Sequence, residues 1–347
     1  MKGLYLLIIG LLVPIISYLS VAAIRRSALR RKLLDVPNER SSHTNPTPRG
    51  GGFAIAVIVL VGFVVCQIVQ RDLPKKLFFA YLLGAIIVSS IGGIDDIFTL
   101  SAKIRLPIHL LAAFVFAFSA GFIDRVYLPF IGDVNLGWLG LPFTVLWIAG
   151  FTNAFNFMDG IDGIAAGQAI VAGLCWIVVS IGLGTPALTT LGGIVTAASL
   201  GFLFHNTPPA KIFMGDAGST LLGYTFATLP VLAFRQTGDS RLFIVGALCV
   251  GPFVFDATLT ILRRALQKEQ LLQAHRSHLY QRLVKLGYFH GSVTLLYLVI
   301  AFLTSAMALA YLWGTDRLSI LALCIAGMLL GLVAVGVTWL EHSEAGS

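Results

Sequence analysis

The stretch LGLPFTVLWIAGFTNAFNFMDGIDGIAAGQAIVAGLCWIVVSIGL, residues 139–183, sets two long apolar runs on either side of four polar side chains. These four follow one another at three-residue spacing: Asn153, Asn156, Asp159 and Asp162. An apolar run of nearly twenty residues is long enough to cross a bilayer as a helix. Polar groups are costly at a lipid boundary, so this ladder indicates a functional site between two membrane-spanning helices.

The remainder of the chain has the same apolar character. Of its 347 residues, 57% are hydrophobic and 12% are charged, and the mean hydropathy is +0.89. Apolar runs recur throughout, and the polar stretches between them are too short for an independent soluble domain. We therefore expect an all-α polytopic membrane protein, with a single membrane-embedded domain over residues 1–347. The four cysteines stand singly within apolar runs, so we expect them to be buried packing residues.

Eleven membrane-spanning helices are predicted from the apolar runs. Their approximate ranges are 4–24, 51–69, 77–94, 106–123, 137–152, 164–182, 187–204, 219–234, 241–262, 291–313 and 317–339. Seven of the 24 lysines and arginines follow the first span, and six follow the ninth. Because basic residues are retained on the cytoplasmic side during insertion, we expect the N-terminus outside and the C-terminus in the cytoplasm.

This topology brings five carboxylates to the cytoplasmic surface of the membrane. Asp95 and Asp96 close the third span, Asp159 and Asp162 open the sixth, and Asp216 opens the eighth. Such a cluster is stable only if a cation neutralises it. Since the available ligands are hard oxygens and no zinc-type spacing is present, Mg²⁺ is the expected metal, with Mn²⁺ as the alternative.

The ladder has a defined geometry if it is helical. Successive side chains at this spacing drift by roughly 60° and form a slanting polar stripe, which a local 3₁₀ turn would stack more closely. The other acidic motifs have structural explanations that stay open. The pair Asp95-Asp96 is also consistent with a polar helix end, and Asp216 with an ordinary N-cap that satisfies backbone donors.

Three further segments are suited to anionic ligands. FHNTPPAKIFMGDAGST (204–220) combines Lys211 with a glycine-flanked helix start, where free amides favour a diphosphate. TPRGGG (47–52) brings Arg49 and three glycines to the second span, either as a phosphate site or as a flexible turn. AHRSHLYQRL (274–283) interleaves histidines and arginines, which suits phosphate binding or proton transfer.

Asp256 stands apart from these motifs. It precedes Arg263 by seven residues, which places it about 10 Å below that end of the predicted ninth span. Pairing with a buried partner is the simplest role for a carboxylate at this depth.

Four motifs together resemble a known family. IDD (94–96), NAFNFMDGIDG (153–163), NTPPAKIFMGDAGS (206–219) and AHRSH (274–278), in this order within eleven spans, are similar to the polyprenyl-phosphate sugar-1-phosphate transferases. This superfamily includes the initiators of O-antigen and enterobacterial common antigen, and the translocase of peptidoglycan synthesis. TPRGGG and HRSH most resemble the O-antigen initiating branch, whose members use UDP-linked N-acetylated or deoxy-N-acetylated hexoses.

The resemblance implies an enzyme that transfers a sugar 1-phosphate from a UDP-sugar to polyprenyl (undecaprenyl) phosphate and releases UMP. It implies a multi-pass protein of the inner (plasma) membrane that initiates a cell-surface polysaccharide such as O-antigen. No nucleic-acid partner is expected, and a homodimer is left open. One alternative is the phospho-MurNAc-pentapeptide translocase, which has three consecutive histidines where this chain has His275-Arg276-Ser277-His278. Another is a secondary transporter, but transporter sites lie near the bilayer midplane rather than at one face.

The resemblance also implies roles for individual residues. The metal ligands would be Asp216, supported by Asp96. The catalytic groups would be Asp95, Asp96, Asp159, His275 and His278. The substrate-binding groups would be Arg49, Asn153, Asn156, Asp162, Asn206, Lys211, Phe213 and Arg276. Among these, Phe213 and Asn206 stand at the positions associated with the uracil ring and the nucleotide. Asp95 is the candidate for aligning or deprotonating the acceptor phosphate, a role that the sequence does not separate from that of Asp96.

Overall fold

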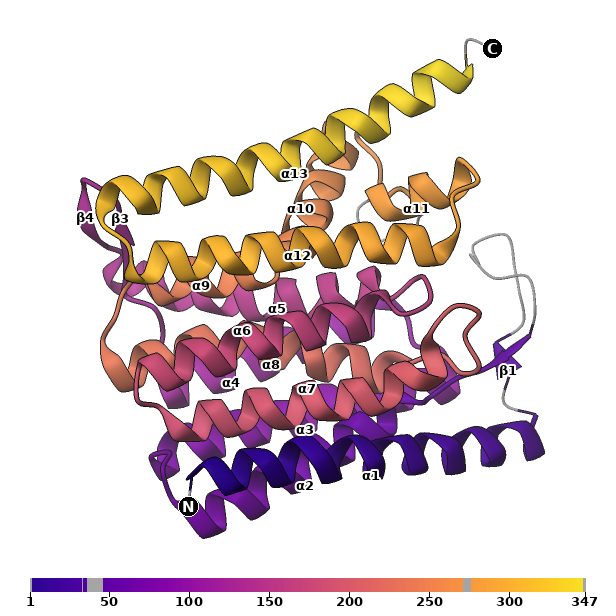
Figure 1. Ribbon diagram of the computed structural model, residues 1–347, viewed down its shortest axis with the longest axis horizontal. Coiled ribbons are helices and arrows are strands. Elements are labelled where there is room, and N and C mark those ends of the chain that lie inside the picture. The colour runs from indigo at the N-terminus through magenta and orange to yellow at the C-terminus, as the bar shows by residue number, and fades with distance from the viewer. Residues whose placement is uncertain (1, 33, 36–45, 271–275, 346–347) are drawn as a thin grey trace.

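Long helices that lie side by side make up most of the protein (Figure 1). The computed structural model describes residues 2–32, 34–35, 46–270 and 276–345. The helices of these residues are α1 (Lys2–Arg30), α2 (Gly52–Gln70), α3 (Lys75–Phe98), α4 (Ala102–Ala120), α5 (Gly140–Met158), α6 (Ile164–Gly182), α7 (Pro186–Asn206), α8 (Asp216–Thr237), α9 (Leu242–Cys249), α10 (Gly251–Leu266), α11 (Leu279–Lys285), α12 (His290–Trp313) and α13 (Asp316–Ala345). A 3₁₀ turn, Gly137–Leu139, precedes α5.

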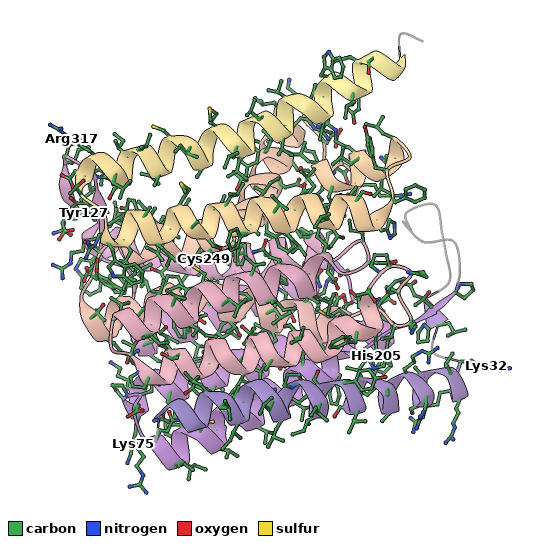
Figure 2. The ribbon with its side chains drawn as sticks, in the orientation of Figure 1. Lys32, Lys75, Tyr127, His205, Cys249 and Arg317 are labelled. Carbon is green, nitrogen blue, oxygen red and sulfur yellow. The ribbon has the colours of Figure 1, made fainter. Side chains whose placement is uncertain are left out.

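Two short antiparallel hairpins mark the two ends of the bundle (Figure 1). Strand β1 (Leu34–Asp35) pairs with β2 (Thr47–Pro48) at one end. Strand β3 (Arg125–Leu128) pairs with β4 (Gly132–Asn135) at the other. Figure 2 shows Lys75, Tyr127 and Arg317 at the β3–β4 end and Lys32 at the β1–β2 end. The helices therefore run between two polar surfaces, as expected of a protein that crosses a membrane several times.

Ten helices in the described part of the chain are long and apolar enough to cross a membrane. Helices α9 and α10 together would supply an eleventh span, but they are bent by 84° at a short break. The all-α polytopic architecture is thus confirmed, including the short fifth span. The prediction of one continuous ninth span over 241–262 is wrong. Helix α10 starts with Gly251-Pro252, and proline has no N–H with which to continue α9.

Helix α8 lies at the centre of the bundle, and α1 and α13 lie at its edges (Figure 1). Every residue of α8 from Asp216 to Phe234 is buried. Exposed leucines and isoleucines cover the outer faces of α1 and α13, as expected where helices contact lipid.

Cys66, Cys175 and Cys249 are buried as predicted. Cys324 on α13 is exposed, which contradicts the prediction, because only one side of this edge helix packs against the bundle.

Glycines bring α2 and α3 unusually close to α8. A Cβ added to Gly52 would lie 2.6 Å from the Cα of Gly218, and one added to Gly92 would lie 2.4 Å from the main-chain oxygen of Asp216. Both distances are too short for any side chain, so these contacts require glycine. Small residues allow helices in membranes to pack closely. The result is that the C-terminal turn of α3 lies against the first turn of α8.

Candidate active site

Three carboxylates converge where α3 and α8 meet. Asp95 and Asp96 belong to the last turns of α3, and Asp216 is the first residue of α8. The main-chain N–H groups of Asp216 and Ala217 donate to the carboxylate of Asp96, at 2.7 and 3.1 Å. Asp96 therefore caps α8, which removes the alternative that Asp216 is the capping side chain. Gly215 has a φ of +80°, and a Cβ on it would lie 2.7 Å from Asp96.

Two arginines hold these carboxylates together. Arg49 Nε lies 3.0 Å from Asp96, and its Nη2 donates to Asp216. Arg105 Nη1 lies 2.6 Å from Asp95 and 2.5 Å from Asp216. Burial opposes the charge of Arg49, but the nearby carboxylates of Asp216 and Asp96 raise the pKa of its guanidinium above the usual value. The cluster is therefore an alternating set of anions and cations that comes from four separate segments.

The polar ladder does not form one helical stripe. Helix α5 continues to Met158, so Asn153 and Asn156 lie in its last turns, while Asp159 and Asp162 lie in the turn before α6. The glycine-rich sequence of this turn ends the helix, with Gly163 at a φ of +79°. Asn156 Nδ2 donates to Ser219 Oγ at 2.9 Å, whereas Asn153 Nδ2 donates within its own helix to Ala149 O at 2.7 Å.

Asp162 and Asn206 connect the start of α6 to the loop before α8. Asp162 accepts from the N–H of Ala210 at 3.0 Å and lies 3.4 Å from His290 Nδ1. Asn206 accepts from the N–H of Gly163 at 2.9 Å and donates to the carbonyl of Ile212 at the same distance. These bonds fix the loop that carries Phe213 to Gly215.

A cavity of about 230 Å³ opens beside the carboxylate cluster. Its lining includes seven residues that the sequence singled out: Arg49, Asn156, Asp159, Asp162, Asn206, Phe213 and Asp216. Burial and the negative charge of Asp216 raise the pKa of Asp159 well above its usual range. Asp95 and Asp96 do not line the cavity. They lie behind the residues that line it: Asp96 contacts Arg49 and Asp216, and Asp95 contacts Arg105.

The cavity also contains residues that sequence reasoning missed. Asp35, Gln281 and His290 contribute to its lining, and Arg105 joins the cluster behind it. The sequence did contain a signal for Arg105. This arginine follows, after a short loop, the span that ends near Asp95 and Asp96, so it lies on the side of the membrane where an acidic cluster needs cations. Gln281 lies within the AHRSHLYQRL segment, but it is uncharged and the pattern of histidines and arginines did not single it out. Asp35 and His290 carried no comparable signal.

Three other predicted site residues, Lys211, Arg276 and His278, are not among the described residues that line the cavity. Lys211 is exposed, and its carbonyl accepts from Arg25 Nε at 3.1 Å. His278 is buried with its Nδ1 3.2 Å from Asp256, and neither it nor Arg276 is among the described residues that line the cavity. His275 lies outside the described residues. Arg276 and His278 share the HRSH motif, but burial separates His278 from the cavity surface.

The sequence is similar to known proteins over most of its length. Residues 78–234, which include the whole carboxylate cluster, match the model of glycosyl transferase family 4. The chain is 32% identical over 330 residues to a probable undecaprenyl-phosphate N-acetylglucosaminyl 1-phosphate transferase of Bacillus subtilis (strain 168), with 94% of this chain and 91% of that protein covered. The chain belongs to this family. It is therefore a sugar-phosphate transferase of the polyprenyl-phosphate hexosamine-1-phosphate transferase superfamily.

Other relatives match less of the chain. A decaprenyl-phosphate N-acetylglucosaminephosphotransferase of Mycobacterium tuberculosis (strain ATCC 25618 / H37Rv) is 30% identical over 320 residues, covering 84% of this chain and 78% of that protein. A phospho-N-acetylmuramoyl-pentapeptide-transferase of Latilactobacillus sakei subsp. sakei (strain 23K) is 31% identical over 208 residues, covering 55% of this chain and 63% of that protein. The N-acetylglucosamine enzymes are thus similar over more of the chain than the pentapeptide enzyme.

Proposed function

We propose that this enzyme transfers the sugar 1-phosphate of a UDP-N-acetylhexosamine, or of its deoxy form, to polyprenyl (undecaprenyl) phosphate. The observation that carries the proposal is the alternating cluster of three aspartates and two arginines beside a polar cavity that Arg49 and Asp216 line. It lies at one end of a membrane bundle, where a lipid phosphate and a water-soluble nucleotide meet. The products are UMP and a polyprenyl-diphosphate sugar, which would initiate a polysaccharide such as O-antigen.

The reaction brings two polyanions together. An oxygen of the lipid phosphate, which is partly dianionic near neutral pH, forms a bond to the β-phosphorus as the bond from that phosphorus to UMP breaks. The bond between the sugar and its phosphate stays intact, so the anomeric configuration is retained. Arg49, which lines the cavity, and Arg105 behind it supply positive charge where the two phosphates approach.

The carboxylates are suited to a divalent metal. Enzymes of this family generally depend on one, and we propose Mg²⁺, with Mn²⁺ as the alternative. Mg²⁺ is commonly bound by one or two carboxylates together with substrate phosphates. Asp216, with Asp96 beside it, offers such hard oxygen donors, although no group of three or more His, Cys, Asp or Glu side chains in the described residues forms a ready-made cage. The metal would neutralise the diphosphate of the UDP-sugar.

We assign the cavity to the cytoplasmic side of the inner (plasma) membrane. The connections between α1 and α2 and between α10 and α12 are rich in arginine and lysine. The described residues of both connections lie at the cavity end (Figure 1). Helix α13 ends there too, whereas α1 begins at the β3–β4 end. The N-terminus would then be outside and the C-terminus cytoplasmic. A reporter fused to the C-terminus that is active only outside the cytoplasm would overturn this assignment.

The test is UMP release by the purified protein in detergent with polyprenyl phosphate and Mg²⁺. The donor panel contains UDP-N-acetylglucosamine, other UDP-N-acetylhexosamines, their deoxy forms and UDP-MurNAc-pentapeptide. We expect release with an N-acetylhexosamine donor, dependence on the lipid acceptor, and loss of release when EDTA removes the metal. Release with the pentapeptide donor alone would favour the translocase, and no release with any donor would leave a transporter as the better explanation.

A further inference from the structure

A buried carboxylate contacts His278 and the start of α11. Asp256, on α10, is 1% exposed. It accepts from the main-chain N–H groups of Leu279 at 2.9 Å and Tyr280 at 3.3 Å, and its Oδ1 lies 3.2 Å from His278 Nδ1. Tyr297 Oη on α12 also donates to it, at 2.6 Å. A buried carboxylate needs such partners, and their convergence ties the first turn of α11 to α10 and α12.

Helix α11 in turn contacts the wall of the cavity. Tyr280 Oη donates to the carbonyl of Phe157 at 2.8 Å, two residues before Asp159. A Cβ on Gly160 would lie 2.0 Å from the same hydroxyl, so the turn that carries Asp159 rests directly on Tyr280. Gln281, the next residue of α11, lines the cavity itself. Tyr280 of α11 therefore supports the cavity wall, and the adjacent residue Gln281 forms part of that wall.

We propose that Asp256 is a positioning residue for the transfer reaction. It fixes the start of α11, α11 places Tyr280 against the last turn of α5, and Tyr280 sets where Asn156 and Asp159 stand in the cavity. Asp256 is not among the described residues that line the cavity, so it acts through Tyr280 rather than on substrate. Displacement of a reacting group by about 1 Å can cost about a hundredfold in rate. The inference rests on the proposed function, because the reaction that Asp256 supports is the proposed sugar 1-phosphate transfer.

The other half of α11 has its own support. Arg282 Nε lies 2.6 Å from Glu341 Oε1 on α13, and Arg282 Nη2 donates to Thr338 Oγ1 at 3.2 Å. A helix of seven residues is not stable by itself, so it depends on such external contacts. Because this pair holds α11 independently of Asp256, a change at Asp256 displaces the start of the helix without releasing the whole of it.

The test combines Asp256→Asn, Tyr280→Phe and the double variant in UMP-release kinetics. Asparagine keeps the shape of Asp256, but it presents an N–H₂ group to donors that need an acceptor. We expect kcat to fall at least tenfold in Asp256→Asn and about fivefold in Tyr280→Phe, with KM for the UDP-sugar within threefold of wild type. If Asp256 acts through Tyr280, the double variant falls no more than twofold below Asp256→Asn.

Tyr311→Phe is the matched control. Like the hydroxyl of Tyr280, the hydroxyl of Tyr311 donates to a main-chain carbonyl. Tyr311 lies on α12, and its acceptor is the carbonyl of Tyr127 at the opposite end of the bundle. The same loss of one hydroxyl there should leave kcat within twofold of wild type. A decrease equal to that of Tyr280→Phe would show that the loss of any such hydrogen bond lowers the rate, and it would overturn the proposal.

Amide hydrogen exchange over residues 157–163 gives a readout that does not depend on turnover. We expect faster exchange in Asp256→Asn and Tyr280→Phe, and unchanged exchange in Tyr311→Phe.

Two results would reduce Asp256 to a purely structural role. One is that the effects of Asp256→Asn and Tyr280→Phe on kcat multiply in the double variant, and the other is unchanged exchange together with a lower unfolding temperature. If Asp256→Asn does not fold, unchanged kcat and exchange in Tyr280→Phe overturn the proposal. If wild type releases no UMP, the proposed function fails, and the exchange measurement still decides whether Asp256 positions this segment.

Discussion

The two ends of the bundle use carboxylates in different ways. At the β3–β4 end, Asp239 pairs with Arg241, two residues further along the chain, at 2.6 Å. Asp316 accepts from Tyr127 Oη, and Asp133 accepts from Ser240 Oγ. Each of these carboxylates has a partner of its own. The contacts of Asp316 and Asp133 join the hairpin to α13 and to Ser240, just before α9.

At the cavity end, three carboxylates share two arginines. Asp216 is bound by Arg49, 167 residues before it, and by Arg105, 111 residues before it. The same arginines also bind Asp96 and Asp95. Holding like charges close together in a buried place costs free energy, and simple pairs would stabilise the fold at lower cost. The difference therefore indicates a functional role for the carboxylates at the cavity end and a structural role for those at the β3–β4 end.

The largest expected effect is that of Asp216→Asn. Asparagine keeps the shape but removes the negative charge that faces two arginines and the proposed metal. We expect at least a hundredfold loss of UMP release, about 3 kcal/mol of transition-state stabilisation, with a normal unfolding temperature in detergent. The matched change at the other end, Asp239→Asn, should leave activity within twofold. Near-wild-type release by Asp216→Asn at saturating Mg²⁺ would reject Asp216 as an essential metal ligand.

Arg105 allows a sharper test, because one nitrogen makes both of its ion pairs. The ammonium group of lysine can replace a single bridging nitrogen, whereas methionine leaves Asp95 and Asp216 without that cation. We expect kcat/KM to fall about thirtyfold in Arg105→Met, about 2 kcal/mol, and no more than about fivefold in Arg105→Lys. Equal losses in both variants would show that the guanidinium shape matters rather than the shared charge.

Two adjacent glycines separate packing from chemistry. A Cβ at Gly92 would lie 2.4 Å from the carbonyl of Asp216, whereas one at Gly93 would lie 3.9 Å from the Cβ of Ala217. Gly92→Ala should push α3 away from α8, lower activity about tenfold and cost about 1–3 kcal/mol of stability. Gly93→Ala should be close to wild type in both respects. Thermal unfolding and UMP release of the two variants check this, and similar behaviour of both would mean that the close approach does not position Asp96.

The smallest effect is expected at Lys211. Its side chain is exposed and lies outside the described lining of the cavity, although the sequence suggested a role in substrate binding. We expect Lys211→Ala to change KM for the UDP-sugar by less than threefold. A tenfold increase in KM would restore Lys211 as a substrate ligand and would extend the functional region beyond the cavity.

Much of the fold was predictable because apolar runs of sufficient length leave few alternatives in a bilayer. The predicted spans over 51–69 and 164–182 correspond to α2 and α6 within a residue or so at each end. The break between α9 and α10 was missed, since a proline in an apolar run is also compatible with an unbroken span; Pro230 lies inside α8. A bend depends on whether neighbouring helices satisfy the freed backbone groups, and a local pattern does not contain that information.

The sequence by itself determined that polar and acidic motifs gather on one side of a membrane, because crossing helices alternate direction and the motifs fall at alternate helix ends. Tertiary structure decided which of these motifs touch. Gly52 and Gly92 let α2 and α3 approach α8, and that approach brings Asp96 to the first N–H groups of α8. It also decided that His278 is buried against Asp256 rather than open to the cavity. The physical reason is that hydropathy and spacing act along one chain, whereas charge sharing and close packing depend on distances between helices.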